Sequence, residues 1–125
     1  MTKKLFLETH QKEGEIYAGI ILGERDYHLF LLPAKTEPLS WDSAVLWALH
    51  TGGSLPTRQE QSLLFANCKE EFEGYYYWSN EQYAHLPDYA WLQHYSYGNR
   101  DNGRKSNEYR ARAVRRVYLA ELESV

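Results

Sequence analysis

The chain has 125 residues and a formal net charge of −3, with 43% hydrophobic and 25% charged residues. A chain of this length and composition forms one globular domain, so residues 1–125 are expected to fold as a single unit. Its longest apolar stretches, at 16–22 and 29–32, have the length of strands, and the mean hydropathy is −0.66, which argues against insertion into a membrane.

Residues 1–35 predict a β-hairpin region. Leu5–Leu7 are apolar and are expected to form a short strand. Residues 15–22 and 27–32 are apolar runs joined by a Gly/Asp turn, which is typical of a hairpin. Pro33 ends the pairing because proline has no N–H to donate, and residues 33–39 form a linker within the domain.

Two helices are predicted next. Ser40 is a candidate N-cap, apolar residues recur at a spacing of three to four from Trp41 onward, and Gly52-Gly53 ends this helix. The second helix covers 58–70, because Thr57 and Glu60 have the spacing of a capping box. Cys68 lies on it and is interpreted as a small buried apolar residue, since no Cys–His spacing supports a nucleophile.

The remainder predicts antiparallel strands at 75–79, 89–94 and 110–119. A segment rich in glycine and asparagine, 98–103, is expected to be a loop. The alternation of the last strand places Arg115 on a face with apolar neighbours, which predicts a partly buried guanidinium that is paired with a carboxylate or stacked on an aromatic ring. Helices that follow a hairpin and precede further strands indicate an α+β domain.

Catalytic and cofactor motifs are absent. The sequence has no nucleophile elbow, glycine-rich phosphate loop, zinc-protease motif or paired cysteines, and its histidines are scattered. It therefore predicts neither an enzyme, a metal site nor a cofactor. One cysteine excludes an internal disulfide and fits a reducing compartment. Because no signal-peptide core follows the first residues, we expect the protein in the cytoplasm of the cell that makes it.

Charge and aromatic content point to recognition. Residues 98–116 hold seven basic and two acidic groups, a local charge of +5, while the other residues sum to −8. Tyr and Trp, eleven and four in number, are more abundant than a core of this size needs. Such features fit a surface for an anionic or protein partner, or else a solvated strand and an ordinary tyrosine-rich sheet.

Several short motifs follow one another in a distinctive order. They are Trp41-Asp42-Ser43-Ala44, the segment Gly52–Glu60 with Leu55-Pro56-Thr57, Trp78-Ser79, Ala90-Trp91 and the closing strand Arg112–Val117. This succession, over about 40–118, resembles the family of unknown function named after the C-terminal domain of the Legionella Lcl adhesin, whose members are frequent in phage and prophage genomes. The first 35 residues resemble the extra hairpin of short phage-encoded versions.

The resemblance implies a C-type-lectin-like fold: an N-terminal β-hairpin, two helices, then antiparallel strands with long loops. It implies that Trp78 and Trp91 supply core rings. Calcium-dependent sugar binding is not expected, because no acid follows Trp78-Ser79-Asn80 in the Trp-Asn-Asp pattern and disulfides are impossible. The paired cysteines of the related formylglycine-generating enzymes are also absent. The fold alone supplies no function.

The sequence thus predicts a non-catalytic binding module of phage or prophage origin, acting in a virion or on a host protein inside the cell. Recognition of a protein, with a glycan less favoured, is assigned to loops 80–88 and 95–109, which are expected to be exposed. The alternative is nucleic-acid binding by the basic segment 98–116. The predicted binding residues are Tyr83, His85, Tyr95, Tyr97, Asn99, Arg100, Arg104 and Lys105.

Overall fold

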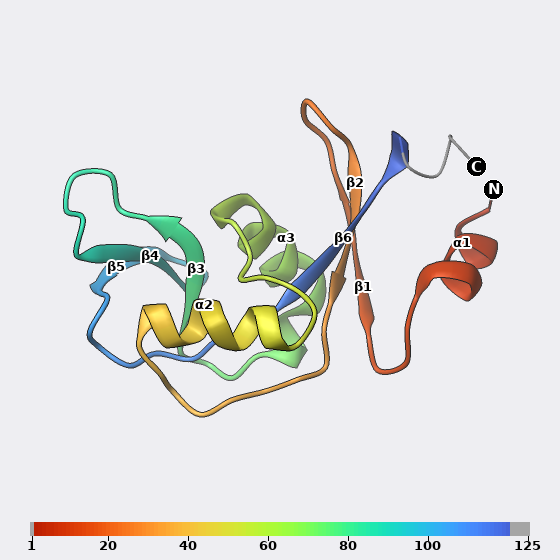
Figure 1. Ribbon diagram of the computed structural model, residues 1–125. Coiled ribbons are helices and arrows are strands. Elements are labelled where there is room, and N and C mark those ends of the chain that lie inside the picture. Colours follow the sequence, from red (N-terminus) through yellow and green to blue (C-terminus); the bar gives the residue numbers. More distant parts are fainter. Residues whose placement is uncertain (1, 121–125) are drawn as a thin grey trace.

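The computed structural model describes residues 2–120, which form an α+β fold of two small antiparallel sheets and intervening helices (Figure 1). The elements are α1 (Lys3–His10), β1 (Ile16–Ile21), β2 (Tyr27–Leu31), α2 (Trp41–His50), α3 (Arg58–Cys68), the 3₁₀ turn η1 (Lys69–Glu71), β3 (Tyr76–Gln82), β4 (Tyr89–His94), β5 (Arg100–Arg104) and β6 (Val114–Tyr118). Within these residues, no helix has the length and apolar character needed to cross a membrane.

The first sheet joins distant parts of the chain. β1 and β2 form the predicted hairpin, with Ile16 opposite Leu31, and β6 pairs antiparallel with β2 to give the order β1-β2-β6. The second sheet has the order β3-β4-β5. Helix α3 lies between the sheets and contacts both, while α2 packs against β3 (Figure 1).

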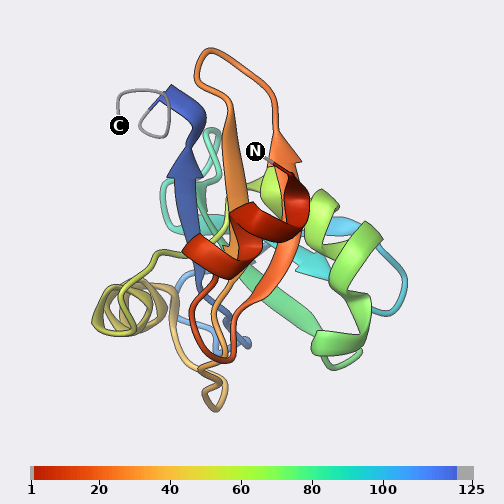
Figure 2. The same ribbon diagram turned by 90° about the vertical axis from the view of Figure 1, so that its right-hand side faces the viewer.

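The N-terminal strand prediction was wrong, because Leu5–Leu7 lie in α1. The Thr2 hydroxyl accepts a hydrogen bond from the Leu5 N–H (3.2 Å) and so caps this helix. Phe6 stacks on His28 with ring centroids 3.9 Å apart, and α1 crosses one face of the first sheet (Figure 2). Three apolar residues in a row fit a strand or one helical turn equally well, and packing on the sheet decides for the helix.

The predicted start of α2 at Trp41 is confirmed, although Ser40 makes no side-chain capping bond. The helix ends at His50, and Gly52 follows with a φ of +92°, a left-handed conformation that favours glycine at this position.

The capping box of α3 is confirmed in both directions. The Glu60 N–H donates to the Thr57 hydroxyl (3.1 Å), and the Thr57 N–H donates to the Glu60 carboxylate (2.9 Å). Cys68, near the other end of the helix, is 1% exposed, and burial together with the charges of Glu70 and Glu71 raises the pKa of its thiol to about 11. Its interpretation as a buried apolar residue is confirmed.

The two N-caps give a matched test of helix capping. We expect Thr57→Ala to lower the free energy of unfolding by about 1 kcal/mol, because it leaves the Glu60 N–H without its acceptor. Ser40→Ala at the start of α2 removes no capping bond. It should lower the free energy of unfolding by no more than a few tenths of about 1 kcal/mol. Urea unfolding of both variants checks this, and equal losses would contradict the assignment.

Trp78 is the centre of the core between α2 and the second sheet. It is 0% exposed and packs with Ala44 and Ala48 of α2 and with Leu92 of β4. Its Nε1 donates to the Leu39 carbonyl at 2.8 Å, so the buried ring has no unpaired polar atom. The predicted core role of Trp78 is confirmed.

The expected loops at 98–103 and 95–109 were wrong in part, because residues 100–104 form β5, which pairs with β4. Gly103 allows β5 to pack closely against the core. A Cβ atom at this position would lie 2.8 Å from both Leu92 and Tyr109, so only glycine lets the backbone approach them so closely. The strand predicted at 89–94 is confirmed. The strand predicted at 75–79 continues to Gln82, into the expected loop 80–88, and the strand predicted at 110–119 begins only at Val114.

The arginines that follow β5 are used inside the fold. Arg115 makes two bonds to the Glu15 carboxylate (2.7 and 2.9 Å) and lies over the Phe30 ring, which confirms its predicted partly buried position. Arg116 makes two bonds to Glu60 (2.6 and 2.7 Å), whose side chain is 0% exposed. These ion pairs join the last strand to the residue that precedes β1 and to α3.

The buried carboxylates predict loss of stability in acid. Burial raises the pKa of Glu60 and of Glu15, but the arginine partners outweigh it, and both pKa values lie below the ordinary 4.5. Because the folded pKa is the lower one, the resulting stabilisation is complete above about pH 4.5 and is lost as the pH falls through the folded values.

We therefore expect the free energy of unfolding to fall steeply below this pH, as measured by denaturant titration at several pH values. Glu60→Gln should flatten the acid limb of the curve, whereas Glu108→Gln, at an exposed position, should leave its shape unchanged. An unchanged slope in Glu60→Gln would contradict the contribution of this carboxyl.

Candidate recognition surface

The predicted binding residues do not form one surface. One of them is buried, and the others lie at or near the surface in separate groups. Tyr95, predicted to be exposed, is 1% exposed, and that prediction was wrong. Its ring stacks on Phe72 with centroids 3.8 Å apart, and burial raises its pKa. The alternation of β4 continues past its end, so Tyr95 points to the same side as Gln93, beneath α3.

Tyr97 and Asn99 lie at the end of the second sheet near His94. Tyr97 is 83% exposed, and its ring stacks on His94 with centroids 4.8 Å apart. The Asn99 side-chain amide donates to the Tyr76 hydroxyl at 3.0 Å. Their predicted exposure is confirmed, but they are not part of the cluster described next.

Trp91, predicted to belong to the core, is half-buried on the outer side of β4. The Arg58 guanidinium lies over its ring at 4.5 Å, and the Tyr83 ring meets it edge-on at 5.0 Å. The core position was wrong because Ala90 and Leu92 point inward, and strand alternation then turns Trp91 outward.

Strand register extends this cluster along β5. Trp91 is opposite Asn102, and Tyr89 is opposite Arg104, so these side chains share one face of the sheet. The Arg104 guanidinium lies over the Tyr89 ring at 5.1 Å and donates to its hydroxyl at 3.0 Å. Helix α3 covers the rest of this sheet face. The exposed part of the face therefore lies at the N-terminal end of α3, which begins at Arg58.

We call this exposed cluster the Trp91 face. It combines three aromatic and three arginine side chains from α3, β4, β5 and the β3–β4 loop: Arg58, Tyr83, Tyr89, Trp91, Arg100 and Arg104. A hollow of about 330 Å³ lies between Arg58, Tyr83, His85 and Trp91, so the structure brings the predicted residues Tyr83 and His85 together here.

Hydrogen bonds hold the arginines in place. Glu81 accepts from the Arg58 backbone N–H (2.6 Å) and guanidinium (3.1 Å). Burial raises the pKa of Glu81, but its bonds to Arg58 outweigh this and keep it below the ordinary value. Arg100 donates to the Arg58 carbonyl (3.1 Å) and the Ser62 hydroxyl (2.6 Å). The face is therefore preorganised before any partner binds.

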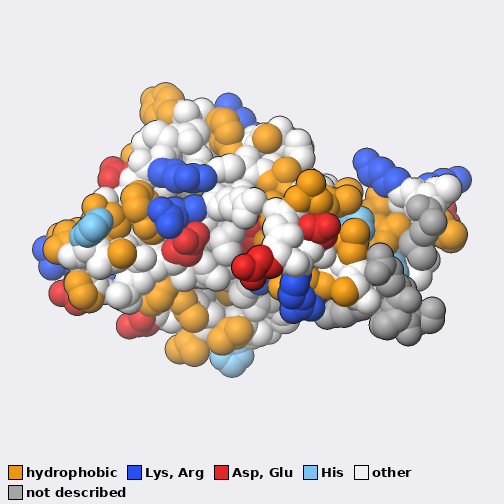
Figure 3. Space-filling view, turned by 90° about the horizontal axis from the view of Figure 1, so that it is seen from above, with side chains coloured by type: hydrophobic (Ala, Val, Ile, Leu, Met, Phe, Trp, Pro, Cys, Tyr) orange, Lys and Arg blue, Asp and Glu red, His pale blue; other side chains and the backbone are white. Residues whose placement is uncertain are grey.

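The positive charge of segment 98–116 is not continuous on the surface. Arg115 and Arg116 are paired internally, Arg110 pairs with Glu73 at 3.1 Å, and Arg112 is 3% exposed. Lys105 lies over the Trp41 ring, where its ammonium group bonds to Gln82. On the side of β4 and β5, Figure 3 shows basic side chains mixed with acidic and hydrophobic ones.

Among residues 2–120, no group of three or more His, Cys, Asp or Glu side chains is placed to hold a metal ion. No family model matches the sequence, and no curated protein matches it. The chemistry of the site therefore has to be inferred from its own residues.

Sequence reasoning missed Arg58, Glu81 and the outward position of Trp91. The alternation of 89–94 contained the information for Trp91, because small Ala90 and apolar Leu92 flank it and mark the inward face. Arg58 had no such marker, since only the packing of α3 against β4 brings it over the tryptophan.

Proposed function

We propose that this protein is a non-catalytic binding module that recognises another protein through the Trp91 face. The observation that carries the proposal is the half-buried Trp91 between Arg58 and Tyr83. Tryptophan, tyrosine and arginine dominate the binding energy of protein interfaces, especially where they are preorganised around a hollow. The three arginines outnumber the single acid, Glu81, so the partner surface is acidic.

The order of elements supports a C-type-lectin-like assignment within this proposal. The pairing of β2 with β6 joins an early strand to the last strand of the fold. The helices α2 and α3 precede a second sheet, β3-β4-β5, whose connecting loops lie on the side away from β2 and β6 (Figure 1). The module would then belong to the resembled phage and prophage family, and would act in a virion or on a host protein.

Nucleic-acid binding is the less favoured alternative. It needs a continuous basic groove with stacking rings, whereas four of the seven basic residues in 98–116 are paired with a carboxylate or buried. Glu81 is also paired with Arg58 of the Trp91 face and so reduces the positive charge of that face.

The proposal is tested by quantitative affinity capture from bacterial lysate with the wild type and two variants. Trp91→Ala should reduce the affinity for a captured partner by about 30-fold, as expected for a central interface tryptophan. Tyr97→Ala is the matched control, because Tyr97 is an exposed aromatic residue outside the Trp91 face. The partner's affinity is then measured with purified proteins.

Partners that bind Trp91→Ala and the wild type equally would contradict the proposal. Loss of binding in Tyr97→Ala alone would place recognition on the 95–99 turn instead. Binding of a labelled oligothymidine that depends on Trp91 would replace the protein partner with a single-stranded nucleic acid.

A further inference from the structure

Strand β5 forms an edge of the second sheet, beside the Trp91 face, and among residues 2–120 it pairs with β4 alone (Figure 1). The His94 N–H donates to the Asn99 carbonyl at 2.9 Å, which shows which residues of this segment bond to β4. Alternate residues of an antiparallel strand bond to opposite sides. Arg100, Asn102 and Arg104 therefore direct their backbone N–H and C=O groups away from β4, to the open edge.

Most of these edge groups have no partner among the described residues. The N–H and C=O of Arg100, the C=O of Asn102 and the N–H of Arg104 make no hydrogen bond. The Asn102 N–H is covered only by the exposed side chain of Asp101, at 2.8 Å. The Arg104 carbonyl accepts from the Asn107 N–H at 2.9 Å. An open row of this kind is the template on which an extended segment of another chain adds as a further strand.

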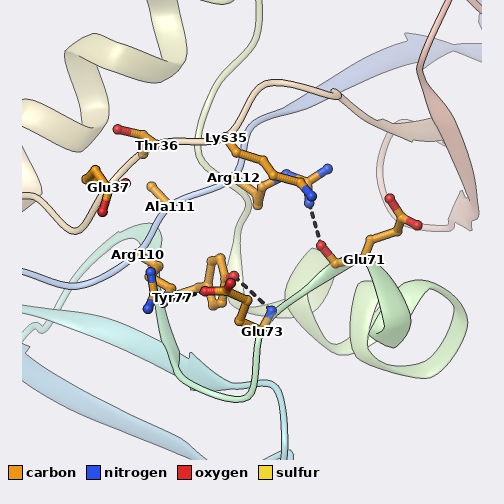
Figure 4. A pocket seen from close by; sticks show the side chains of 9 residues that line it. All are labelled: Lys35, Thr36, Glu37, Glu71, Glu73, Tyr77, Arg110, Ala111 and Arg112. Carbon is orange, nitrogen blue, oxygen red and sulfur yellow. Dashed lines mark hydrogen bonds and ion pairs between the residues drawn. The ribbon is translucent and has the colours of Figure 1, made fainter.

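The positive charge on this edge is available, unlike that of the arginines before β6. Arg110 and Arg112 are bonded to the segment after α3 (Figure 4). Arg100 and Arg104 are exposed, and their side chains lie on the same side of the sheet as the Trp91 face. Each uses only Nη2 in hydrogen bonds, to α3 or to Tyr89, and among the described residues neither pairs with a carboxylate.

We propose that the partner of the Trp91 face adds an extended acidic segment to β5 as an antiparallel strand. This inference rests on the proposed function and describes its partner more closely. Residues directly opposite each other in such a pair place their side chains on the same face. The partner residues opposite Arg100 and Arg104 are therefore four positions apart, and both are acidic, so that each guanidinium meets a carboxylate.

A second copy of this chain fits the same edge poorly. Antiparallel pairing of β5 with itself about Asn102 would set Arg100 of each copy opposite Arg104 of the other, on the same face. Like charges directly opposite each other destabilise a sheet. The arginines thus oppose self-association through this edge and favour an acidic strand from a different protein.

The test uses the synthetic peptide acetyl-Thr-Glu-Thr-Thr-Thr-Glu-Thr-amide, titrated to millimolar concentration into the isotope-labelled full chain at low salt. Its glutamates match the spacing of Arg100 and Arg104, and threonine favours strands. We expect saturable NMR shifts of the β5 amides. A peptide with two threonines between the glutamates places its acids on opposite faces and should bind about threefold more weakly.

Backbone methylation of the peptide tests the strand pairing itself. The central threonine lies opposite Asn102 and directs its N–H to the Asn102 carbonyl, whereas the N–H of the next threonine points away from β5. N-methylation of the central threonine should abolish saturable binding. N-methylation of the next threonine should leave the affinity within about twofold of the original.

Variants of the full chain locate the binding edge. Asn102→Pro removes an outward N–H without removing a bond to β4, whereas Asn102→Ala keeps it, so only the proline variant should lose the peptide. If the proline variant does not fold, the methylated peptides decide independently. Arg100→Gln and Arg104→Gln should each weaken binding about threefold, and Lys4→Gln, at an exposed position on α1, should not change it.

The inference is overturned if the peptide gives no saturable shift, if the two methylated peptides bind equally, or if a folded Asn102→Pro binds like Asn102→Ala. Stronger binding of oligothymidine at the same β5 amides would also overturn it, in favour of a nucleic acid. Each of these results leaves the proposed function standing where capture of a protein still depends on Trp91. Peptide binding at β5 together with partners that ignore Trp91→Ala would support the edge site and contradict the Trp91 face.

Discussion

Replacing Trp78 with alanine is expected to lower the free energy of unfolding by about 3–5 kcal/mol, which is a large part of the 5–15 kcal/mol that a domain of this size has in total. The ring is fully buried between α2 and the second sheet, so its removal leaves a cavity lined by Ala44, Ala48 and Leu92. The Leu39 carbonyl also loses the hydrogen bond from the indole N–H. Guanidinium unfolding followed by circular dichroism measures the loss.

Trp91→Ala is the matched control for this experiment, since it removes the same side chain from a neighbouring strand. Because Trp91 is half-buried and lies on the outer face, we expect its removal to cost clearly less than that of Trp78. Equal losses in the two variants would move Trp91 into the core and would undermine the recognition surface built around it.

Local rules predicted much of this fold. The capping box of Thr57 and Glu60 placed α3 at its observed start, and the Gly23–Asp26 turn placed the first hairpin. Alternation along 110–119 predicted the environment of Arg115 before its partner was known. In each case the deciding interactions are made between residues close in sequence, or by a periodicity that the chain displays directly.

Tertiary packing decided the remaining elements. The N-terminal helix is held by contact of Phe6 with His28 and Phe30, which lie on β2. Strand β5 depends on the close approach of Gly103 to Leu92 and Tyr109, although glycine and asparagine are unfavourable in strands by themselves. No short segment of the sequence contains these contacts.

The candidate site was predicted in part for the same reason. Tyr83, His85, Arg100 and Arg104 lie on or beside the Trp91 face, but Tyr95 turned out to be a core residue stacked on Phe72. A count of charges along 98–116 could not distinguish arginines that face solvent from those with buried partners such as Glu60. The position of a partner across the fold determines whether a charge is available for recognition.

Arg116→Met is expected to destabilise the protein by about 3–5 kcal/mol, because it leaves the carboxylate of Glu60 buried without its cation. The loss should exceed that of Arg110→Met, whose partner Glu73 is 65% exposed and can be solvated. The Glu60 carboxylate would keep only the Tyr27 hydroxyl (2.6 Å) and the Thr57 N–H (2.9 Å) as donors.

The double variant Arg116→Met with Glu60→Gln separates the two causes of this loss. Glutamine removes the buried charge but keeps an oxygen for the Thr57 N–H, so the double variant should recover part of the stability that Arg116→Met alone loses. Urea unfolding of the wild type, both single variants and the double variant completes the cycle. If the two losses simply add, the ion pair contributes nothing as a pair, and the side-chain packing of Arg116 alone explains its effect.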